Sequence, residues 1–243
     1  MKRTPEQKIQ EDQYEFPYHH LVNFSHFDNH KTLYGGLNYY GYINKVIEHI
    51  NQENFHSLLD VGCGDGKLIF ELAKENKARK LVGIDYSERA ILFAKAFNYR
   101  SDLEFICGDV RKLNGIYDVI SIVEVLEHIH DDDMGEFLNS VFNLLSADGR
   151  LVVSVPSTND PLNSKHYRHY TLESLLETLN QFKLEKHSFV ISNSRAHVFI
   201  ARLSNKFCSF SIMRSLLLKV SEKFFFNAKE KTGTHIIAVF RKI

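Results

Sequence analysis

The sequence predicts an α/β protein built around one mostly parallel sheet with helices on both faces, and two observations support this prediction. From residue 57 to about residue 191, short apolar runs typical of buried strands alternate with segments of helical periodicity. A glycine-rich turn, Asp60-Val-Gly-Cys-Gly-Asp-Gly66, connects the first expected strand to the first expected helix of this alternation. Because such alternation is the signature of βαβ units, we expect a single open sheet to contain most of the chain.

The expected elements follow the chain in a regular order. Strands are expected at 57–59, 80–84, 103–107, 117–123, 150–156, 183–191 and 235–241. Helices are expected near 66–75, 87–97, 132–146 and 171–181. Thr171 is a candidate N-cap of the last of these helices, because a threonine hydroxyl can accept a hydrogen bond from a first-turn amide.

The N-terminal part differs in composition, and we expect residues 1–42 to form a cap segment before a domain at 43–243. Residues 14–42 contain nine Phe or Tyr and four His, without a clear period, so short helices and loops are expected there. Tyr42, Val46 and Ile50 then recur at helical spacing and lead to the first strand.

A helical insert is expected at about 192–232, between the last two strands. Its apolar residues recur every three or four positions, with cationic residues outside the stripe. The stripe consists of Phe207, Phe210, Met213, Leu217, Val220 and Phe224, and the cations are Lys206, Arg214, Lys219 and Lys223. Such a helix can pack on the domain or on a second subunit of a homodimer. It can also lie on an anionic membrane or cover an apolar substrate.

Composition indicates a globular chain of one domain. The 243 residues have a net charge of zero and are 44% hydrophobic, which is ordinary for such a chain. Residues 183–243 contain twelve Lys or Arg and three acids, a charge of +9, which favours an anionic neighbour. The three cysteines have no paired or metal-binding spacing, and the first residues do not resemble a signal peptide. We therefore expect a cytoplasmic protein, with peripheral membrane contact through the insert.

Acidic residues follow four of the expected strands. Asp60 opens the glycine-rich turn, Asp85 follows the second strand, Asp109 the third and Glu124 the fourth. In open α/β sheets the carboxyl ends of the strands form the ligand-binding edge. Carboxylates in a glycine-rich cradle disfavour a pyrophosphate and favour a ligand with an ammonium and a sulfonium. Asp85, nineteen residues after Gly66, is placed to accept hydrogen bonds from ribose hydroxyls.

At these residues the chain resembles the class I S-adenosylmethionine-dependent methyltransferases. Asp60 to Gly66 matches their first motif, and Gly108-Asp109-Val110 resembles their adenine-side motif. Val123 to Ile129 resembles the motif beside the transferred methyl group, and the similarity extends over residues 40–182. The resemblance implies S-adenosylmethionine as cofactor and a Rossmann-like sheet of seven strands in the order 3-2-1-4-5-7-6. It also implies cofactor contacts from Asp60, Gly62, Gly64, Gly66, Asp85, Tyr86, Asp109, Val110 and Glu124.

Two histidine-containing clusters are candidates for the acceptor side. One follows the fourth strand and the other, Lys165-His-Tyr-Arg-His-Tyr170, follows the fifth. An alcohol acceptor must lose a proton, and a placed base accelerates this step by about 10²–10⁴-fold. The candidate catalytic residues are Glu127, His128, His166 and His169. Arg168 can hold an anionic group of the substrate or brace its own loop.

The expected function is O-methylation of a small-molecule, glycan or lipid-linked acceptor, as in ubiquinone-type methyltransferases. Glu124, Glu127, His128 and His169 also resemble the metal site of the methyltransferases that modify the 3′-terminal ribose of small RNAs. The downstream match is poor in spacing and no basic RNA-binding platform is evident, so neither a metal nor a nucleic-acid partner is assigned. A third alternative is a partner subunit that binds the cofactor without catalysing transfer.

Overall fold

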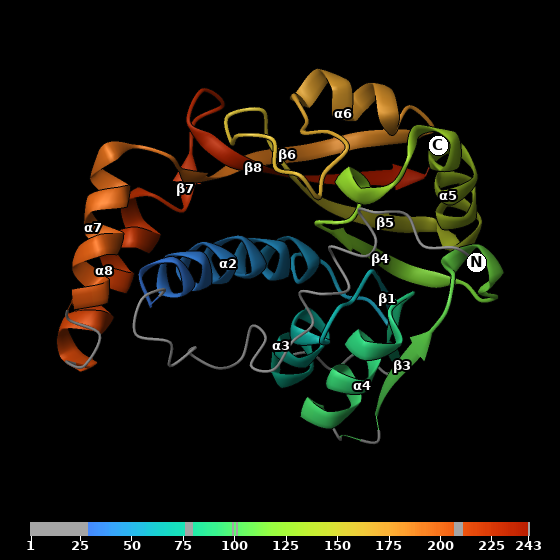
Figure 1. Ribbon diagram of the computed structural model, residues 1–243. Helices are drawn as coiled ribbons and strands as arrows, with labels where there is room; N and C mark the ends of the chain where they lie inside the picture. The colour runs from blue at the N-terminus through green and yellow to red at the C-terminus, as the bar shows by residue number, and fades with distance from the viewer. Residues whose placement is uncertain (1–28, 76–79, 99, 101, 207–210, 243) are drawn as a thin grey trace.

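The structure, a computed structural model, describes residues 29–75, 80–98, 100, 102–206 and 211–242 (Figure 1). In these residues eight strands form one sheet in the order β3-β2-β1-β4-β5-β8-β6-β7. The strands are β1 (Ser57–Val61), β2 (Lys80–Asp85), β3 (Leu103–Cys107), β4 (Tyr117–Val123), β5 (Leu145–Pro156), β6 (Phe182–Ser192), β7 (Asn227–Ala228) and β8 (Gly233–Lys242).

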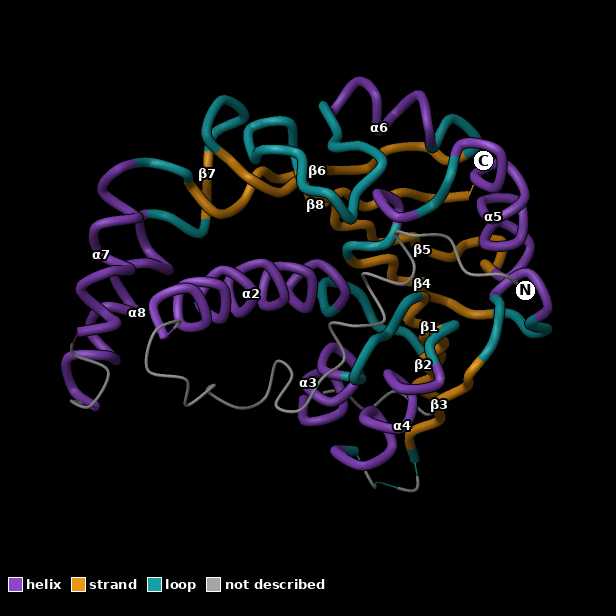
Figure 2. Tube along the Cα trace, viewed as in Figure 1, coloured by secondary structure: helices purple, strands orange, loops and turns teal. Residues whose placement is uncertain are grey.

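The order of the seven long strands confirms the predicted topology. Strands β3, β2, β1, β4 and β5 are parallel, whereas β8 lies antiparallel between β5 and β6. The difference is a two-residue strand, β7, which pairs with β6 at the edge. The tube in Figure 2 shows the strands following one another across the molecule with helices on either side. The parallel part of the sheet therefore presents the carboxyl ends of β1 to β5 at one edge.

The four predicted helices are present with boundaries close to those expected. They are α3 (Lys67–Glu75), α4 (Glu88–Phe97), α5 (Asp131–Leu144) and α6 (Leu172–Thr178). Thr171 is the N-cap of α6, since its hydroxyl accepts a hydrogen bond from the Ser174 amide at 3.1 Å. Two short 3₁₀ helices, η1 (Val110–Lys112) and η2 (Leu126–His128), follow β3 and β4. No helix within the described residues combines the length and apolar character needed to cross a bilayer.

The segment before β1 differs from the expectation. Residues 29–50 form one continuous helix, α2 (Asn29–Ile50), which crosses the predicted boundary at residue 42. The reason is packing: Ile43, Val46 and Ile50 are buried, and a Cβ on Gly41 would lie 2.6 Å from the Ile191 side chain. Close contact with β6 therefore holds the helix where composition alone indicated loops. Residues 1–28 lie outside the described part of the chain.

The insert between β6 and β8 contains two helices where the sequence indicated one stripe. These are α7 (Arg195–Lys206) and α8 (Ser211–Phe224), and Phe207 and Phe210 of the predicted stripe lie outside the described residues. Figure 1 shows α7 and α8 side by side beyond the β6–β7 end of the sheet, with α2 running from them towards its centre.

Each face of the sheet has its own core, as the two-residue alternation of a strand requires. On one face Leu59 and Ile120 pack with helices α5 and α6. On the other, Leu58 and Val119 pack with α2, α3 and α4. The strands are thus covered on both sides, and their carboxyl ends remain available for a site.

Candidate functional site

A cavity of about 660 Å³ lies at the carboxyl edge of the parallel strands. The cavity brings together most of the residues that the sequence singled out. Its lining includes Asp60, Gly62, Gly64, Asp85, Tyr86, Asp109, Val110 and Glu124 of the predicted cofactor set, and Glu127, His128 and His166 of the predicted catalytic set. Gly66 and His169 do not line it. One cavity therefore contains both the cofactor loop and the histidine clusters.

The glycine-rich turn needs glycine at defined positions. Gly62 has φ +74°, and a Cβ there would lie 2.3 Å from Cγ2 of Val125. Gly66 has φ +77° and packs against the Phe105 ring, so it shapes the turn without reaching the cavity. At Gly64 the backbone N–H donates to Asp85 Oδ2 at 3.0 Å. This hydrogen bond fixes the turn to β2, near the place where the protein backbone is expected to contact the ligand.

Asp85 is buried and held from two sides. Its Oδ1 accepts a hydrogen bond from the Ser87 amide at 2.8 Å, in addition to the contact with Gly64. Its carboxylate lines the cavity in a fixed orientation. This is the arrangement expected of an acid that orients hydroxyl groups of a nucleoside.

Asp60 lies beside it in a different electrostatic situation. Burial raises the pKa of Asp60 to about 7, although the hydrogen bond from Ser121 Oγ at 2.7 Å opposes the rise. The negative charge of Asp85 adds to the increase. A cationic ligand group in the cavity would favour the ionised form, so the site fits a ligand that carries positive charge.

Asp109 is engaged by a residue that the sequence did not single out. Arg111 Nη2 lies 2.7 Å from Asp109 Oδ2, and hydrogen bonds from Arg111 lower the pKa of Asp109. The same guanidinium reaches Glu136 on α5 at 3.0 Å. Arg111 therefore connects η1 and the cavity residue Asp109 to α5. The pattern Asp-Val-Arg was visible in the sequence, but only the turn of η1 brings the two side chains together.

Glu124 follows β4 in the left-handed region, with φ +56°, which is unusual for a residue other than glycine. Its Oε1 accepts a hydrogen bond from Ser154 Oγ at 2.8 Å, and its Oε2 lies 3.4 Å from His235 Nε2. Burial opposes ionisation of Glu124, but His235 and Ser154 outweigh it and lower its pKa. Strained backbone of this kind collects at functional sites.

His235 is a cavity residue that sequence reasoning missed. The Thr234 hydroxyl donates to the Ile191 carbonyl, so its oxygen accepts from His235 Nδ1–H at 2.9 Å. With Glu124 at Nε2, both ring nitrogens are donors. Burial disfavours a charged ring, but Glu124 raises the pKa of His235. Tyr42 stacks on the imidazole, with 4.8 Å between ring centroids.

Glu127 on η2 is fully buried, and neither carboxylate oxygen has a hydrogen-bond partner among the described residues. Burial and the nearby charge of Glu124 raise its pKa well above the usual range. Its nearest partner is His128, whose Nε2 lies 3.8 Å from Oε1. A buried carboxyl without partners requires an explanation, such as a proton or a cationic ligand.

His128 presents an unprotonated nitrogen to the cavity. Its Nδ1 lies 2.9 Å from the Lys165 carbonyl oxygen, which can only accept, so the proton of the neutral ring is on Nδ1. Burial lowers the pKa of His128 to about 4. At neutral pH the ring is therefore uncharged, and Nε2 carries a lone pair.

His166 reaches the same state through His169. The His169 Nδ1–H donates to the Asp160 carbonyl at 2.9 Å, so His169 Nε2 accepts from His166 Nδ1–H at 2.7 Å. His166 Nε2 is then unprotonated. Burial, and secondarily His128, lower the pKa of His166 to about 3. His169 therefore contacts His166 from outside the cavity, and its catalytic role stays a prediction.

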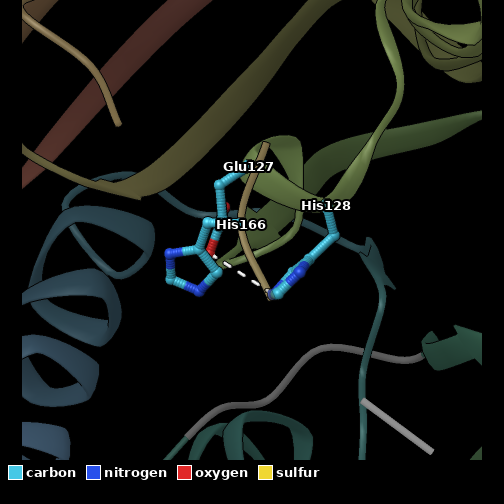
Figure 3. Close-up of side chains that lie close together, drawn as sticks. All are labelled: Glu127, His128 and His166. Carbon is cyan, nitrogen blue, oxygen red and sulfur yellow. Dashed lines mark ion pairs between the residues drawn. The ribbon is translucent and has the colours of Figure 1, made fainter. Parts of the chain in front are cut away.

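Figure 3 shows Glu127, His128 and His166 close together, and their ligating atoms all lie within 4.8 Å of one another. Among the described residues the possible metal ligands are these three, which differ from the four residues that resemble the RNA methyltransferase site. His169 is not among them, and its Nε2 is hydrogen-bonded to His166. The three possible ligands offer acceptors, which fits a cation or a group with several protons.

Of the two roles expected for Arg168, the structure shows contacts that brace the protein. Its Nη1 donates to the carbonyls of Leu126 and Ile129 at 3.0 and 2.7 Å, and Nη2 pairs with Asp131. The guanidinium therefore braces η2 and the start of α5. In this way it holds the loop that carries Glu127 and His128.

Comparison with known proteins agrees with this geometry. The model of a methyltransferase domain matches residues 53–205, well over half of the chain. The chain belongs to the methyltransferase domain family. This confirms the predicted superfamily, the class I S-adenosylmethionine-dependent methyltransferases, and its Rossmann-like fold.

The matches to individual relatives cover only about half of each protein. A ubiquinone biosynthesis O-methyltransferase of Neisseria meningitidis serogroup C is 31% identical over 119 residues, 46% of this chain and 47% of the relative. A trans-aconitate 2-methyltransferase of Deinococcus radiodurans is 26% identical over 140 residues, 58% of this chain and 50% of the relative. The chain thus spans about half the length of the curated relatives it matches.

Solved structures share the fold over a longer stretch. The N-methyltransferase NodS of Bradyrhizobium japonicum WM9, in complex with S-adenosyl-L-homocysteine, has a TM-score of 0.59 at 15% identity. The match covers 98% of this chain and 99% of NodS. At this identity the likeness is one of fold, and the choice of acceptor must be argued from the site.

Proposed function

We propose that the protein transfers a methyl group from S-adenosylmethionine to a hydroxyl oxygen of a small-molecule, glycan or lipid-linked acceptor. Membership of the methyltransferase domain family supports the reaction class. The name of the Neisseria relative, an O-methyltransferase of ubiquinone biosynthesis, supports oxygen as the acceptor atom. The observation that carries the proposal is the pair of neutral imidazoles, His128 and His166, on the wall of the cavity that the cofactor loop also lines.

The cofactor half of the cavity fits a cationic nucleoside. We assign the ribose hydroxyls to Asp85, whose carboxylate is held by the amides of Gly64 and Ser87, and Gly62 leaves room where any side chain would meet Val125. Asp60, with its pKa near 7, becomes a carboxylate when a positive group approaches. When bound, S-adenosylmethionine supplies the methyl group and becomes S-adenosylhomocysteine.

The acceptor half supplies a base. As the acceptor oxygen bonds to the methyl carbon, its proton passes to Nε2 of His166 or His128. Neutral amines often need only positioning, whereas an alcohol gains about 10²–10⁴-fold from a placed base. Alignment of the two reactants in one cavity can lower the activation barrier by about 7–11 kcal/mol. Both imidazoles are unprotonated at neutral pH, and although their lowered pKa values make them weak bases, they can take the strongly acidic proton of the oxygen as its bond to the methyl carbon forms. A proton acceptor at this place favours a hydroxyl acceptor.

The test follows a labelled methyl group. Purified protein is incubated with methyl-labelled S-adenosylmethionine and a panel of phenols, sugars and prenylated phenols, each paired with its amine analogue. The proposal expects label on oxygen, and His128→Ala/His166→Ala, which removes both candidate bases, should lower turnover by about 10²-fold or more, while His187→Ala, at an exposed histidine on β6, keeps it. Transfer only to nitrogen, or equal activity of both variants, contradicts it.

A metal-assisted version of the same transfer is a second candidate, favoured by the convergence of Glu127, His128 and His166. Imidazole nitrogens and a carboxylate are a fitting donor set for Zn²⁺ or Mn²⁺, and the orphaned oxygens of Glu127 are what such an ion would satisfy. A bound ion would lower the pKa of an acceptor hydroxyl nearby.

Chelation separates the two candidates. If the imidazoles act as bases alone, activity is complete in EDTA. If an ion is needed, EDTA abolishes activity, Mn²⁺ or Zn²⁺ restores it, and calorimetry detects binding of the metal that Glu127→Gln weakens. Metal-dependent turnover on RNA 3′ ends would favour the RNA alternative. Binding of S-adenosylhomocysteine without turnover on any acceptor would favour a partner subunit.

A further inference from the structure

The exposed face of helix α8 combines apolar and cationic side chains. Leu216 and Phe224 are 55% and 59% exposed, and Lys219 and Lys223 between them are also exposed. Lys219 lies three residues after Leu216 and Lys223 four residues after Lys219, so these three share one side of the helix. Phe224, eight residues after Leu216, lies about 80° around the helix from it. Lys223 Nζ lies 5.3 Å from the centroid of the Phe224 ring.

The other side of α8 is packed, which fixes this orientation. Ser221 is buried, and Glu222 accepts a hydrogen bond from the Tyr40 hydroxyl of α2 at 3.3 Å. Just after the helix, Phe225 lies against the His197 ring of α7, with 5.0 Å between centroids. The helix is therefore held by its neighbours, and the face with Leu216 and Phe224 points away from them.

Helix α7 adds another exposed aromatic residue. His197 is buried, and its Nε2 lies 3.2 Å from Asn38 Oδ1 of α2. Phe199, two residues later, is 64% exposed, as expected for a position about 200° further around the helix. We call Leu216, Lys219, Lys223 and Phe224 of α8 the insert face, and Phe199 is an exposed residue of the neighbouring helix.

The charge of the insert identifies the partner. Residues 192–232 contain eight Lys or Arg and two acids, a net charge of +6, and one of these acids, Glu222, is hydrogen-bonded to Tyr40. Apolar side chains flanked by lysines are typical of helices that lie in a membrane interface. A symmetric dimer would place the same cationic face against itself, so like charges would oppose it.

We infer that the insert face docks on an anionic bilayer surface. Leu216 and Phe224 enter the boundary of the acyl chains, and Lys219 and Lys223 lie among the lipid phosphates. The insert connects to the cavity through α2, because α7 packs on α2 and Tyr39 and Tyr42 of α2 line the cavity. Docking is separate from the proposed function, although it would suit a lipid-linked acceptor.

Vesicle sedimentation tests the inference on the full chain. Wild type should pellet with phosphatidylglycerol-containing vesicles, less so at physiological salt, and remain in solution with phosphatidylcholine alone. Lys219→Glu/Lys223→Glu should bind at least about 30-fold more weakly, since each basic residue contributes about a factor of five at an anionic surface. Lys229→Glu/Lys231→Glu, with the same charge change outside the face, should keep most of the binding.

A third variant separates docking from simple charge attraction. Leu216→Ser/Phe224→Ser keeps the charge and should also weaken binding, and both S-adenosylhomocysteine affinity and melting temperature should stay as in wild type for every variant. Equal weakening by the two charge-reversal variants, or equal binding to both lipids, overturns the inference. So does a dimer in light scattering that Lys219→Glu/Lys223→Glu dissociates without any vesicle binding by wild type.

Discussion

Individual carboxyl groups in the cavity differ by whether a cation accompanies them. Glu124 is paired with His235 and Asp109 with Arg111, and both carboxyls have lowered pKa values. Glu127 is buried without a partner in the described residues, and its pKa is raised. Since unpaired burial disfavours charge, Glu127 is the group whose state a ligand can change most.

Asp85→Ala should weaken binding of S-adenosylhomocysteine by about 10–150-fold, because losing a hydrogen bond to a charged acceptor costs about 1.5–3 kcal/mol. Calorimetry measures this directly, with Glu173→Ala, an exposed acid on α6, as the control. If the folded wild type does not bind S-adenosylhomocysteine, the proposed cofactor is wrong.

His169→Ala should lower turnover by about 10–100-fold without changing cofactor affinity, because it removes the acceptor that holds His166 in its tautomer. His169→Gln retains an acceptor and should recover part of the activity. A positioning role also predicts a changed pH profile for the alanine variant. Unchanged turnover and profile would show that His166 does not depend on this contact.

The site residues that were predicted lie next to the strand that positions them, whereas the residue that was missed lies far along the chain from its partner. Asp60, Asp85 and Asp109 each follow their own strand directly, so a local pattern was enough to place them at one edge. His235 lies 111 residues after Glu124 and meets it only because β8 pairs with β5 beside β4. A single histidine before an apolar strand carries no local signal of this contact.

Among the elements, the turn between β1 and α3 depends most on backbone geometry. Gly62→Ala introduces a side chain at positive φ and a contact of 2.3 Å with Val125, so roughly 2–4 kcal/mol of stability should be lost. Thermal unfolding should show a decrease in melting temperature of about 5–15 °C. Val125→Ala in the same chain should restore part of the loss, because it removes the contact but not the backbone strain.

Gly135→Ala is the matched control. It lies on the exposed side of α5, where a Cβ would have no atom within 4 Å, and the replacement should stabilise the helix by about 0.5–1 kcal/mol. If both glycine variants change the melting temperature alike, the special geometry of Gly62 is not what the turn requires.

Helix α2 shows where an element resists prediction. Aromatic residues on several sides of residues 29–42 hide the apolar period. Only the contacts of Gly41 with Ile191 of β6 and with Phe226, two residues after α8, reveal its buried side. Strands β1, β2, β4 and β5 were predictable because both of their faces are largely buried, which leaves apolar runs in the sequence. The boundary of the insert was predictable, but its division into α7 and α8 was not.

At the scale of the whole molecule, two groups of buried residues make the stability of the fold depend on pH in opposite directions. His128 and His166 have lowered pKa values, so below about pH 6.5 the unfolded chain binds protons that the folded chain does not. Stability from these rings is complete above that pH and is lost as the pH falls. Glu127 and Asp60 have raised pKa values, so their contribution is complete below about pH 4 and is lost as the pH rises.

Between about pH 4.5 and 6 the effects of the two pairs on the pH dependence of stability nearly cancel. The unfolded chain binds two more protons on the histidines, and the folded chain binds two more on the carboxyl groups. His128→Asn/His166→Asn removes one side of the cancellation. In EDTA, the unfolding free energy of wild type relative to this variant should rise by up to about 2.7 kcal/mol per pH unit across that range. Glu127→Gln should give the opposite slope of about 1.4 kcal/mol per unit. Denaturant titrations at several pH values measure both, and parallel curves for all three proteins would mean that these groups are not held in the protonation states assigned to them.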